Sequence, residues 1–269
     1  MTRLLMCRPD HYGIYYEINP WMDRRRQADR AVALRQWEGL YRLLTDMLRF
    51  HVELLPPISG LPDLCFTANA GLLVNGLFVS SRFRYREREA EVPYYTRWFL
   101  ERGYRVACLP EPAFFEGEGD ALFCGDLLFA GYRFRSELQA HRLLSELIGR
   151  PVYSLEMTDP WFYHLDTCFC PLQAGRAAYY PEAFSPASQR LLKETIAELI
   201  PVTETEARRF ACNAIVVGQA VVMNADCPHL SQMLAETGYR VYEVGTTEFL
   251  KAGGGPKCLA LFLDRDESW

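Results

Sequence analysis

The feature that most limits what this chain can fold into is a repeat that runs through most of its length. Five segments share one pattern: a polar residue, a short apolar run, a turn and a second apolar run. The last segment lacks the second apolar run. The polar residues stand about 45 to 51 residues apart, at Asn69, Asp120, Asp166, Asn213 and Cys258. A period of this length is typical of chains built from repeated supersecondary units.

Each of the first four repeats is predicted to contain a β-hairpin. Asn75-Gly76, Gly125-Asp126 and Gly218-Gln219 stand where two-residue hairpin turns favour a positive φ. The flanking runs are short and rich in Val, Leu and Phe, which indicates buried strands. Between successive hairpins the apolar spacing predicts a helix and then one further strand. The predicted helices cover residues 27–50, 136–148, 185–200 and 228–236.

The two ends of the repeat array favour a closed ring over an open stack. An open solenoid needs polar caps at both ends, whereas Arg3–Cys7 and Cys258–Leu263 are both apolar single strands. The simplest account is that these strands pair and close a five-bladed α/β propeller with pseudo-five-fold symmetry. The polar residue that starts each hairpin would then face one central site. The alternative is an ordinary α/β domain in which the spacing is coincidental.

Composition narrows the class of protein further. The chain has 269 residues and a net charge of -5, so we expect a single domain over residues 1–269 and no nucleic-acid partner. It contains no run of 18 apolar residues and no secretory signal pattern, so we expect no membrane span and a cytoplasmic location. The nine cysteines are expected to be reduced thiols. Cys168 and Cys170 lack an accompanying CxxC pair, so no metal site is expected.

Three stretches at the starts of the hairpins carry unusually reactive side chains. His164 and Asp166 are two residues apart, which on a strand puts them on one face. The segment 116–120, Glu-Gly-Glu-Gly-Asp, offers three carboxylates, the group that matches a guanidinium fork. Cys258 follows Gly-Gly-Gly-Pro-Lys, where glycines permit close approach of a ligand. Taken singly, each residue is as well explained by a structural role, but all of them stand at one phase of the repeat.

These stretches carry a resemblance to the pentein superfamily of guanidino-group modifying enzymes, which includes arginine deiminases and dimethylarginine dimethylaminohydrolases. The matching motifs are Leu61–Asn69, Phe115–Leu122, His164–Thr167 and Gly253–Cys258, in the family's order. The resemblance implies a five-bladed α/β propeller, in agreement with the repeat.

Within the superfamily, the chain most resembles the arginine dihydrolases. The stretches Cys7–Tyr12, Ile18–Met22 and Phe66–Ala70 carry this closer likeness. Deiminases and dimethylarginine hydrolases usually have Asp where this chain has Asn69, and their acidic motif differs from 116–120 by one residue.

The resemblance also implies a mechanism and a set of site residues. Cys258 is the expected nucleophile, His164 its acid/base partner, and Glu116, rather than Glu118, the carboxylate that orients His164. Asp166 is expected to hold the guanidinium, and Asn213 to have a structural role. The remaining residues expected to bind substrate are Asn19, Asn69, Arg88, Glu118, Asp120 and Arg135, of which the two arginines would bind the α-carboxylate.

Three functional hypotheses follow. The first is an arginine dihydrolase that gives ornithine, ammonia and carbon dioxide. The second is a one-step arginine deiminase or dimethylarginine dimethylaminohydrolase that stops at citrulline, with an amidinotransferase as a variant. The third is a non-catalytic ring. The Cys258, His164 and Glu116 set argues against the third. The expected partner is a small arginine-like guanidino compound, with a homo-oligomer possible and no cofactor implied.

Overall fold

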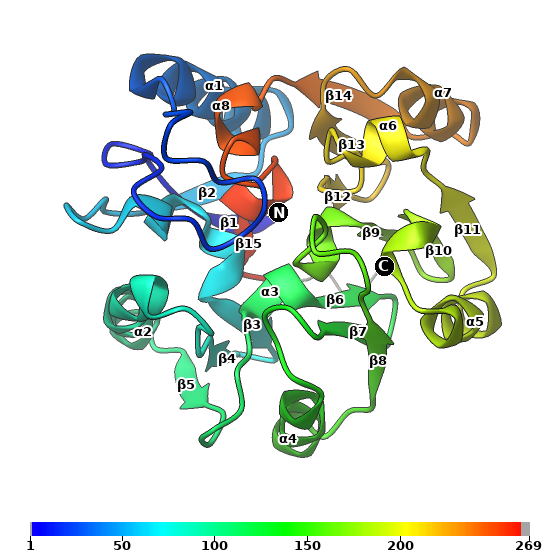
Figure 1. Cartoon of the computed structure of the whole chain (residues 1–269), viewed down its shortest axis with the longest axis horizontal. Helices are drawn as coiled ribbons and strands as arrows, with labels where there is room; N and C mark the ends of the chain where they lie inside the picture. Colours follow the sequence, from blue (N-terminus) through cyan, green and yellow to red (C-terminus); the bar gives the residue numbers. More distant parts are fainter. Residues whose placement is uncertain (1, 265–269) are drawn as a thin grey trace.

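The computed structural model describes residues 2–264, and its strands form five three-stranded sheets arranged around a common centre (Figure 1). The sheets are β15-β1-β2, β3-β4-β5, β6-β7-β8, β11-β10-β9 and β12-β13-β14. The predicted five-bladed α/β propeller is therefore confirmed. The single-domain assignment to residues 1–269 stays a prediction, and residues 1 and 265–269 lie outside the described part.

In each of the four inner blades two strands pair as an antiparallel hairpin, and a third strand adds in parallel beside the hairpin's second arm. The strands of these blades are β3 (Gly71–Val74), β4 (Leu77–Ser80), β5 (Arg105–Cys108), β6 (Ala121–Cys124), β7 (Leu127–Tyr132), β8 (Val152–Glu156), β9 (Phe169–Gln173), β10 (Arg176–Tyr179), β11 (Glu198–Pro201), β12 (Ile215–Val217), β13 (Ala220–Asn224) and β14 (Arg240–Val244). The turns have the backbone that the sequence predicts, with positive φ at Asn75, Gly76, Gly125 and Gly218.

The fifth blade joins the two ends of the chain. β1 (Arg3–Cys7) pairs in parallel with β2 (His51–Leu55) and antiparallel with β15 (Leu261–Phe262). The predicted pairing of the terminal strands is thus confirmed. Leu4, Leu5 and Leu261 are fully buried there, and burial of each leucine side chain contributes about 1.5–3 kcal/mol.

The longer helices lie on the outside of the ring, and the one-turn helix α3 lies near its centre (Figure 1). The helices are α1 (Arg30–Arg42), α2 (Val92–Glu101), α3 (Gly117–Asp120), α4 (Leu138–Ile148), α5 (Pro186–Thr195), α6 (Glu204–Ala207), α7 (Pro228–Glu236) and α8 (Thr247–Leu250). No helix within residues 2–264 has both the length and the apolar character needed to cross a membrane.

Two of the predicted helices are longer than the α-helices that the structure contains at these positions. The 27–50 stretch begins later, where the Asp29 side chain caps α1, and α1 continues into a π-helical turn at Leu43–Met47. The 185–200 stretch ends as a helix at Thr195. Its apolar residues at 199 and 200 belong instead to β11, because they pair with β10. A short apolar run serves a helix or a strand equally well, so periodicity alone did not separate them.

Four of the five polar residues that start the repeats, all except Asn213, lie on short helical turns near the ring centre. These turns are Thr67–Ala70, Gly117–Asp120, Leu165–Thr167 and Lys257–Leu259. The prediction that His164 and Asp166 share one face of a strand is wrong. His164 is extended, but a 3₁₀ turn begins at the next residue, so the two side chains are directed to different partners.

Close packing at the centre leaves no room for a side chain at one glycine. Gly117 has a φ of +59°, and a Cβ there would lie 2.6 Å from the backbone nitrogen and oxygen of Gly71. Backbone atoms cannot rotate away as a flexible side chain can. Gly117 therefore lets the turn before β6 contact β3 of the neighbouring blade directly.

Gly117→Ala should destabilise the fold more than the same change at an open site. Gly60 has a φ of +86° and nothing within 4 Å of an added Cβ, so Gly60→Ala should cost only the left-handed backbone term, about 1–2 kcal/mol. Gly117→Ala adds overpacking and should cost about 2–4 kcal/mol. The free energy of unfolding from urea titration measures both. Equal losses for the two variants would show that the centre tolerates expansion.

Candidate active site

Many of the residues singled out in the sequence surround one narrow cavity near the ring centre. Cys258 lines this cavity together with residues from the loop after β1, from the turns at the starts of the blades and from the glycine run. The other lining residues are Ile18, Asn19, Met22, Asp63, Phe66, Asn69, Arg88, Arg135, Tyr163, Ala252 and Gly254. His164, Glu116 and Asp166 are buried and contact these lining residues.

Cys258 is held on both sides by polar side chains. Its thiol donates to Oδ2 of Asp166 at 3.3 Å and accepts from Nδ2 of Asn213 at 3.1 Å. The Asn213 oxygen also accepts from the backbone N–H of Cys258 at 3.1 Å. Burial, and then the negative charge of Asp166, raises the pKa of the Cys258 thiol well above its ordinary value. Without a bound cation the sulfur is therefore a protonated thiol at neutral pH.

The Asp166 carboxylate contacts Cys258 through only one of its two oxygens. Its Oδ1 is buried and has no hydrogen-bond partner. Burial raises the pKa of Asp166 to about 7, against the lowering effect of the nearby Lys257 ammonium. Lys257 is itself paired with Glu118, with Nζ 3.0 Å from Oε2. A cationic ligand would both satisfy Oδ1 and favour the ionised carboxylate.

The glycine run before Cys258 exists because side chains would not fit. A Cβ on Gly255 would lie 2.9 Å from Oδ1 of Asn213, the atom that accepts from the Cys258 backbone. A Cβ on Gly254 would lie 2.5 Å from the ring of Phe66. These glycines let the chain pass close to both the cavity wall and the residue that orients the cysteine.

His164 and Glu116 form a buried pair, with Nε2 2.7 Å from Oε2. Nη1 of Arg135 donates to the same oxygen at 3.0 Å. Burial alone would raise the pKa of Glu116, but the charges of Arg135 and His164 outweigh it and hold that pKa well below its usual range. Glu116 is therefore a permanent carboxylate that fixes the His164 ring. The structure pairs His164 with Glu116 and not with Glu118.

Asn69 is fixed in one orientation by Arg88. Nη1 of Arg88 donates to Oδ1 of Asn69 at 2.7 Å, and since a guanidinium can only donate, the amide oxygen must face it. Arg88 is fixed in turn by a bidentate ion pair with Glu91, at 2.9 and 2.8 Å. Nδ2 of Asn69 is buried and has no partner. Asn69, a residue of the cavity wall, therefore has a free donor, which lies against Gly119.

The two remaining cavity residues expected from the sequence already have protein partners. Arg135 donates to the Ile18 carbonyl at 2.9 Å and lies 4.6 Å from the ring centre of Tyr163. Asn19 donates to the Ala252 carbonyl at 3.0 Å and accepts from the backbone N–H of Trp21 at 2.9 Å. Both side chains shape the cavity wall.

Glu118 and Asp120 are not among the residues that line the cavity. Glu118 binds Lys257, as above, and Asp120 accepts from the Ser136 hydroxyl at 2.6 Å and from the Leu165 backbone N–H at 3.2 Å. Burial raises the pKa of Asp120 to about 6 despite the opposing charge of His164. The geometry does not support the expected contact of these two residues with substrate, because both lie behind the residues that line the cavity.

Sequence reasoning missed one carboxylate of the cavity. Asp63 is 2% exposed, and its Oδ1 has no hydrogen-bond partner within 3.5 Å, although the Tyr16 hydroxyl is close enough to lower the pKa of this carboxyl. Burial raises the pKa of Asp63, with the charge of Arg88 opposing it. Asp63 stands in the Leu61–Asn69 motif, six residues before Asn69, but off the phase of the repeat that guided the choice of site residues. No three or more His, Cys, Asp or Glu side chains within residues 2–264 are grouped so as to hold a metal ion.

The fold and cavity together define a five-bladed α/β propeller with a buried cysteine near its centre. Known proteins are similar to this chain in both sequence and fold. The chain is 47% identical to the bifunctional arginine dihydrolase/ornithine cyclodeaminase AgrE of Nostoc sp. over 96% of its own length, but spans only 37% of that protein. It is 39% identical to an N(G),N(G)-dimethylarginine dimethylaminohydrolase of Mycobacterium tuberculosis, covering 96% of this chain and 85% of that protein.

Solved structures agree. ArgZ is the bifunctional arginine dihydrolase/ornithine cyclodeaminase of Synechocystis sp.. A variant of its N-terminal domain, covalently bound to a reaction intermediate, superposes on this chain with a TM-score of 0.94 at 43% identity, over 98% of both chains. No family model matches the chain. The chain belongs to the pentein superfamily of guanidino-group modifying enzymes, in the part that contains the arginine dihydrolases and dimethylarginine dimethylaminohydrolases.

Asp166→Asn should make the Cys258 thiol easier to ionise. Removal of the neighbouring negative charge should lower the thiol pKa, while burial keeps it elevated. The pH dependence of the iodoacetamide reaction rate measures this, in a Cys108→Ser background because Cys108 is the exposed thiol. Asp126→Asn, at an exposed turn carboxylate, is the matched control. An unchanged midpoint in Asp166→Asn would remove Asp166 as a cause of the raised pKa.

Proposed function

We propose that the chain is an arginine dihydrolase that converts arginine to ornithine, ammonia and carbon dioxide through a covalent Cys258 intermediate. One observation carries the proposal: three buried polar atoms around Cys258 have no partner. They are Oδ1 of Asp63, Oδ1 of Asp166 and Nδ2 of Asn69. Unpaired buried polar groups are costly, and a ligand that pairs them recovers that cost. Two acceptors and one donor suit a cationic group that becomes a carbonyl.

The first round follows from the charges in the site. A guanidinium beside Asp166 places a positive charge next to the Cys258 thiol and favours the thiolate. The sulfur attacks the guanidinium carbon, and His164, held by Glu116, gives a proton to the departing ammonia. Water then adds to the same carbon, gives up a proton to His164 and expels the sulfur. Arginine and water yield citrulline and ammonia.

The second round requires the neutral citrulline to stay bound. Its ureido group carries a carbonyl oxygen, which needs a donor. Nδ2 of Asn69 is such a donor, and the hydrogen bond from Arg88 to Oδ1 leaves it free for a ligand. A second attack by Cys258, loss of ammonia and addition of water give the carbamic acid of ornithine, which breaks down to ornithine and carbon dioxide.

The runner-up is a one-step hydrolase that releases citrulline. The identity to the M. tuberculosis dimethylarginine dimethylaminohydrolase, over nearly the whole of both chains, favours it. In this function the amine lost in the first step is ammonia or dimethylamine, and the same Cys258, His164 and Glu116 would act. The two functions differ in whether citrulline leaves before the second attack.

Incubation with arginine should give ornithine as the main amino-acid product, and Cys258→Ser should give none. Loss of a covalent nucleophile removes a step that the other groups do not replace, so turnover should fall by about 10³-fold or more. Amino-acid chromatography measures both products. The buried Cys212→Ser variant is the control. If Cys258→Ser keeps a tenth of the activity, the nucleophile lies elsewhere.

Asn69→Asp should divert product from ornithine to citrulline. One oxygen of the new carboxylate would bind Arg88, and the other would face the ureido oxygen with lone pair against lone pair. Such a mismatch costs about 1–3 kcal/mol, which changes the partition by about tenfold or more. The ratio of ornithine to citrulline in a single incubation measures the effect.

Two outcomes decide between the functions. Wild-type enzyme that releases only citrulline would remove the dihydrolase proposal and leave the one-step alternative. An unchanged ratio in Asn69→Asp, with ornithine formed by the wild type, would keep the dihydrolase and remove Asn69 as the group that retains citrulline.

A further inference from the structure

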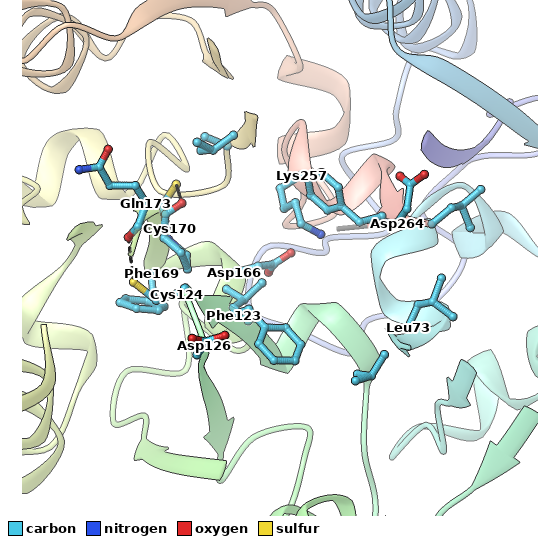
Figure 2. Close-up of a pocket in the computed structure, with 18 of the residues that line it drawn as sticks. Leu73, Phe123, Cys124, Asp126, Asp166, Phe169, Cys170, Gln173, Lys257 and Asp264 are labelled. Atoms are coloured by element: carbon cyan, nitrogen blue, oxygen red, sulfur yellow. Dashed lines mark hydrogen bonds between the residues drawn. The ribbon is translucent and has the colours of Figure 1, made fainter. Parts of the chain in front are cut away.

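Buried polar side chains also lie behind the residues that line the cavity around Cys258. Lys257 and Glu118 form an ion pair there, and Lys257 borders a separate cavity of about 570 Å³ at the hairpin turns (Figure 2). Asp120 and Ser136 form a second pair, and both are fully buried. Neither of these two residues lines the separate cavity or the cavity around Cys258. Their polar atoms therefore serve other groups of the protein.

The Asp120 carboxylate joins two turns of the chain. Its Oδ2 accepts from the Ser136 hydroxyl at 2.6 Å and from the Ser136 backbone N–H at 3.1 Å. Its Oδ1 accepts from the Leu165 backbone N–H at 3.2 Å. The Ser136 hydroxyl oxygen accepts in turn from the backbone N–H of Glu116 at 3.0 Å. A continuous series of hydrogen bonds thus runs from Glu116 through Ser136 and Asp120 to Leu165.

The two ends of this series lie at the contact between Glu116 and His164. Glu116 binds Nε2 of His164 at 2.7 Å, and Leu165 directly follows His164 in the chain. The His164 ring also lies against α3, because a Cβ on Gly119 would be 3.3 Å from two of its ring carbons. Burial raises the pKa of Asp120 to about 6, and the charge of His164 opposes this rise. Asp120 is therefore connected to His164 both through hydrogen bonds and through charge.

We propose that Asp120 and Ser136 are positioning residues for His164. They fix the main chain on both sides of the contact between His164 and Glu116, whereas Arg135 fixes the Glu116 side chain. A buried hydrogen-bond network whose members are all paired is rigid. The inference rests on the proposed function, in which His164 gives a proton to ammonia and takes one from water in every round. Both transfers need the ring in one place.

Asp120→Asn tests the proposal with almost no change in volume. The amide oxygen can replace one carboxylate oxygen, but the NH2 group must then face a donor of Ser136 or of Leu165. We expect kcat to fall by about 10- to 100-fold, since misplacing reacting groups by about 1 Å costs that much. The KM for arginine should stay within about twofold, because the polar atoms proposed to bind substrate are unchanged. Ammonia release at varied arginine concentration measures both.

Ser136→Ala is a milder variant that removes only the hydroxyl. It should also lower kcat, because the Glu116 N–H loses its acceptor. The double variant with Asp120→Asn should lose about as much kcat as the worse single variant, since residues that act as a unit are not additive. The matched control is Ser188→Ala, at a buried serine whose oxygen accepts from the Glu156 backbone N–H at 2.7 Å. It should lose stability to urea but keep kcat.

A substrate whose leaving group needs no proton separates a misplaced His164 from general damage to the site. In S-methylthiocitrulline a methylthio group replaces one terminal nitrogen of arginine. The Cys258 sulfur attacks the central carbon, the bond from that carbon to the methylthio sulfur breaks, and methanethiolate leaves and takes a proton from water. With Asp120→Asn in excess, first-turnover release of methanethiol should fall by less than about threefold, whereas ammonia release from arginine falls about 10- to 100-fold. Rapid quench and mass spectrometry measure both rates.

The outcomes separate this inference from the proposed function. Equal losses on the two substrates would overturn the inference, because they would place the defect at Cys258 or in substrate binding. Unchanged kcat in both single variants would also overturn it, as would a loss in Ser188→Ala equal to that in Ser136→Ala. Release of citrulline alone by the wild type would overturn the dihydrolase only. The loss in the variants would then be measured on the amine that leaves in the first round.

Discussion

Closure of the ring is the constraint on which the rest of the structure depends. The pairing of β1 with β15 brings Cys258, near the end of the chain, beside turns that begin some 90 to 190 residues earlier. The hydrogen bonds of Cys258 to Asp166 and Asn213 span 92 and 45 residues of sequence. None of these contacts is local, so the reaction centre forms only when all five blades are in place. Catalytic geometry and global folding are therefore coupled in this protein.

The five-fold spacing was enough to predict the ring, the hairpin turns and the joining of the terminal strands. Residue roles were harder, because they depend on backbone turns of one or two residues. Glu116 and Glu118 are separated by a single residue, Gly117, which has a φ of +59°. One carboxylate binds His164 and the other binds Lys257. Asp63 escaped notice because it lies off the phase of the repeat. An expectation built on periodicity finds what recurs and misses what one blade alone supplies.

The arginines show a further limit of reasoning from residue type. Arg88 and Arg135 were expected to bind a carboxylate of the substrate, yet each is already paired with a buried glutamate of the protein. A buried ion pair costs desolvation and is weak evidence for stability. Here the pairs fix the direction of Asn69 and His164, the two groups that must meet a ligand in a defined orientation. Their contribution is rigidity in the site.

The depth of the unpartnered carboxylates has a consequence for ionic strength. Asp63 and Asp166 are 2% and 1% exposed, so mobile ions cannot approach either carboxylate. Screening acts on charges that face solvent and only weakly on buried ones. Added salt should therefore slow the arrival of a cationic substrate at the surface while leaving its rate of departure nearly unchanged. The attraction between the buried carboxylates and a cationic ligand would therefore depend little on salt concentration.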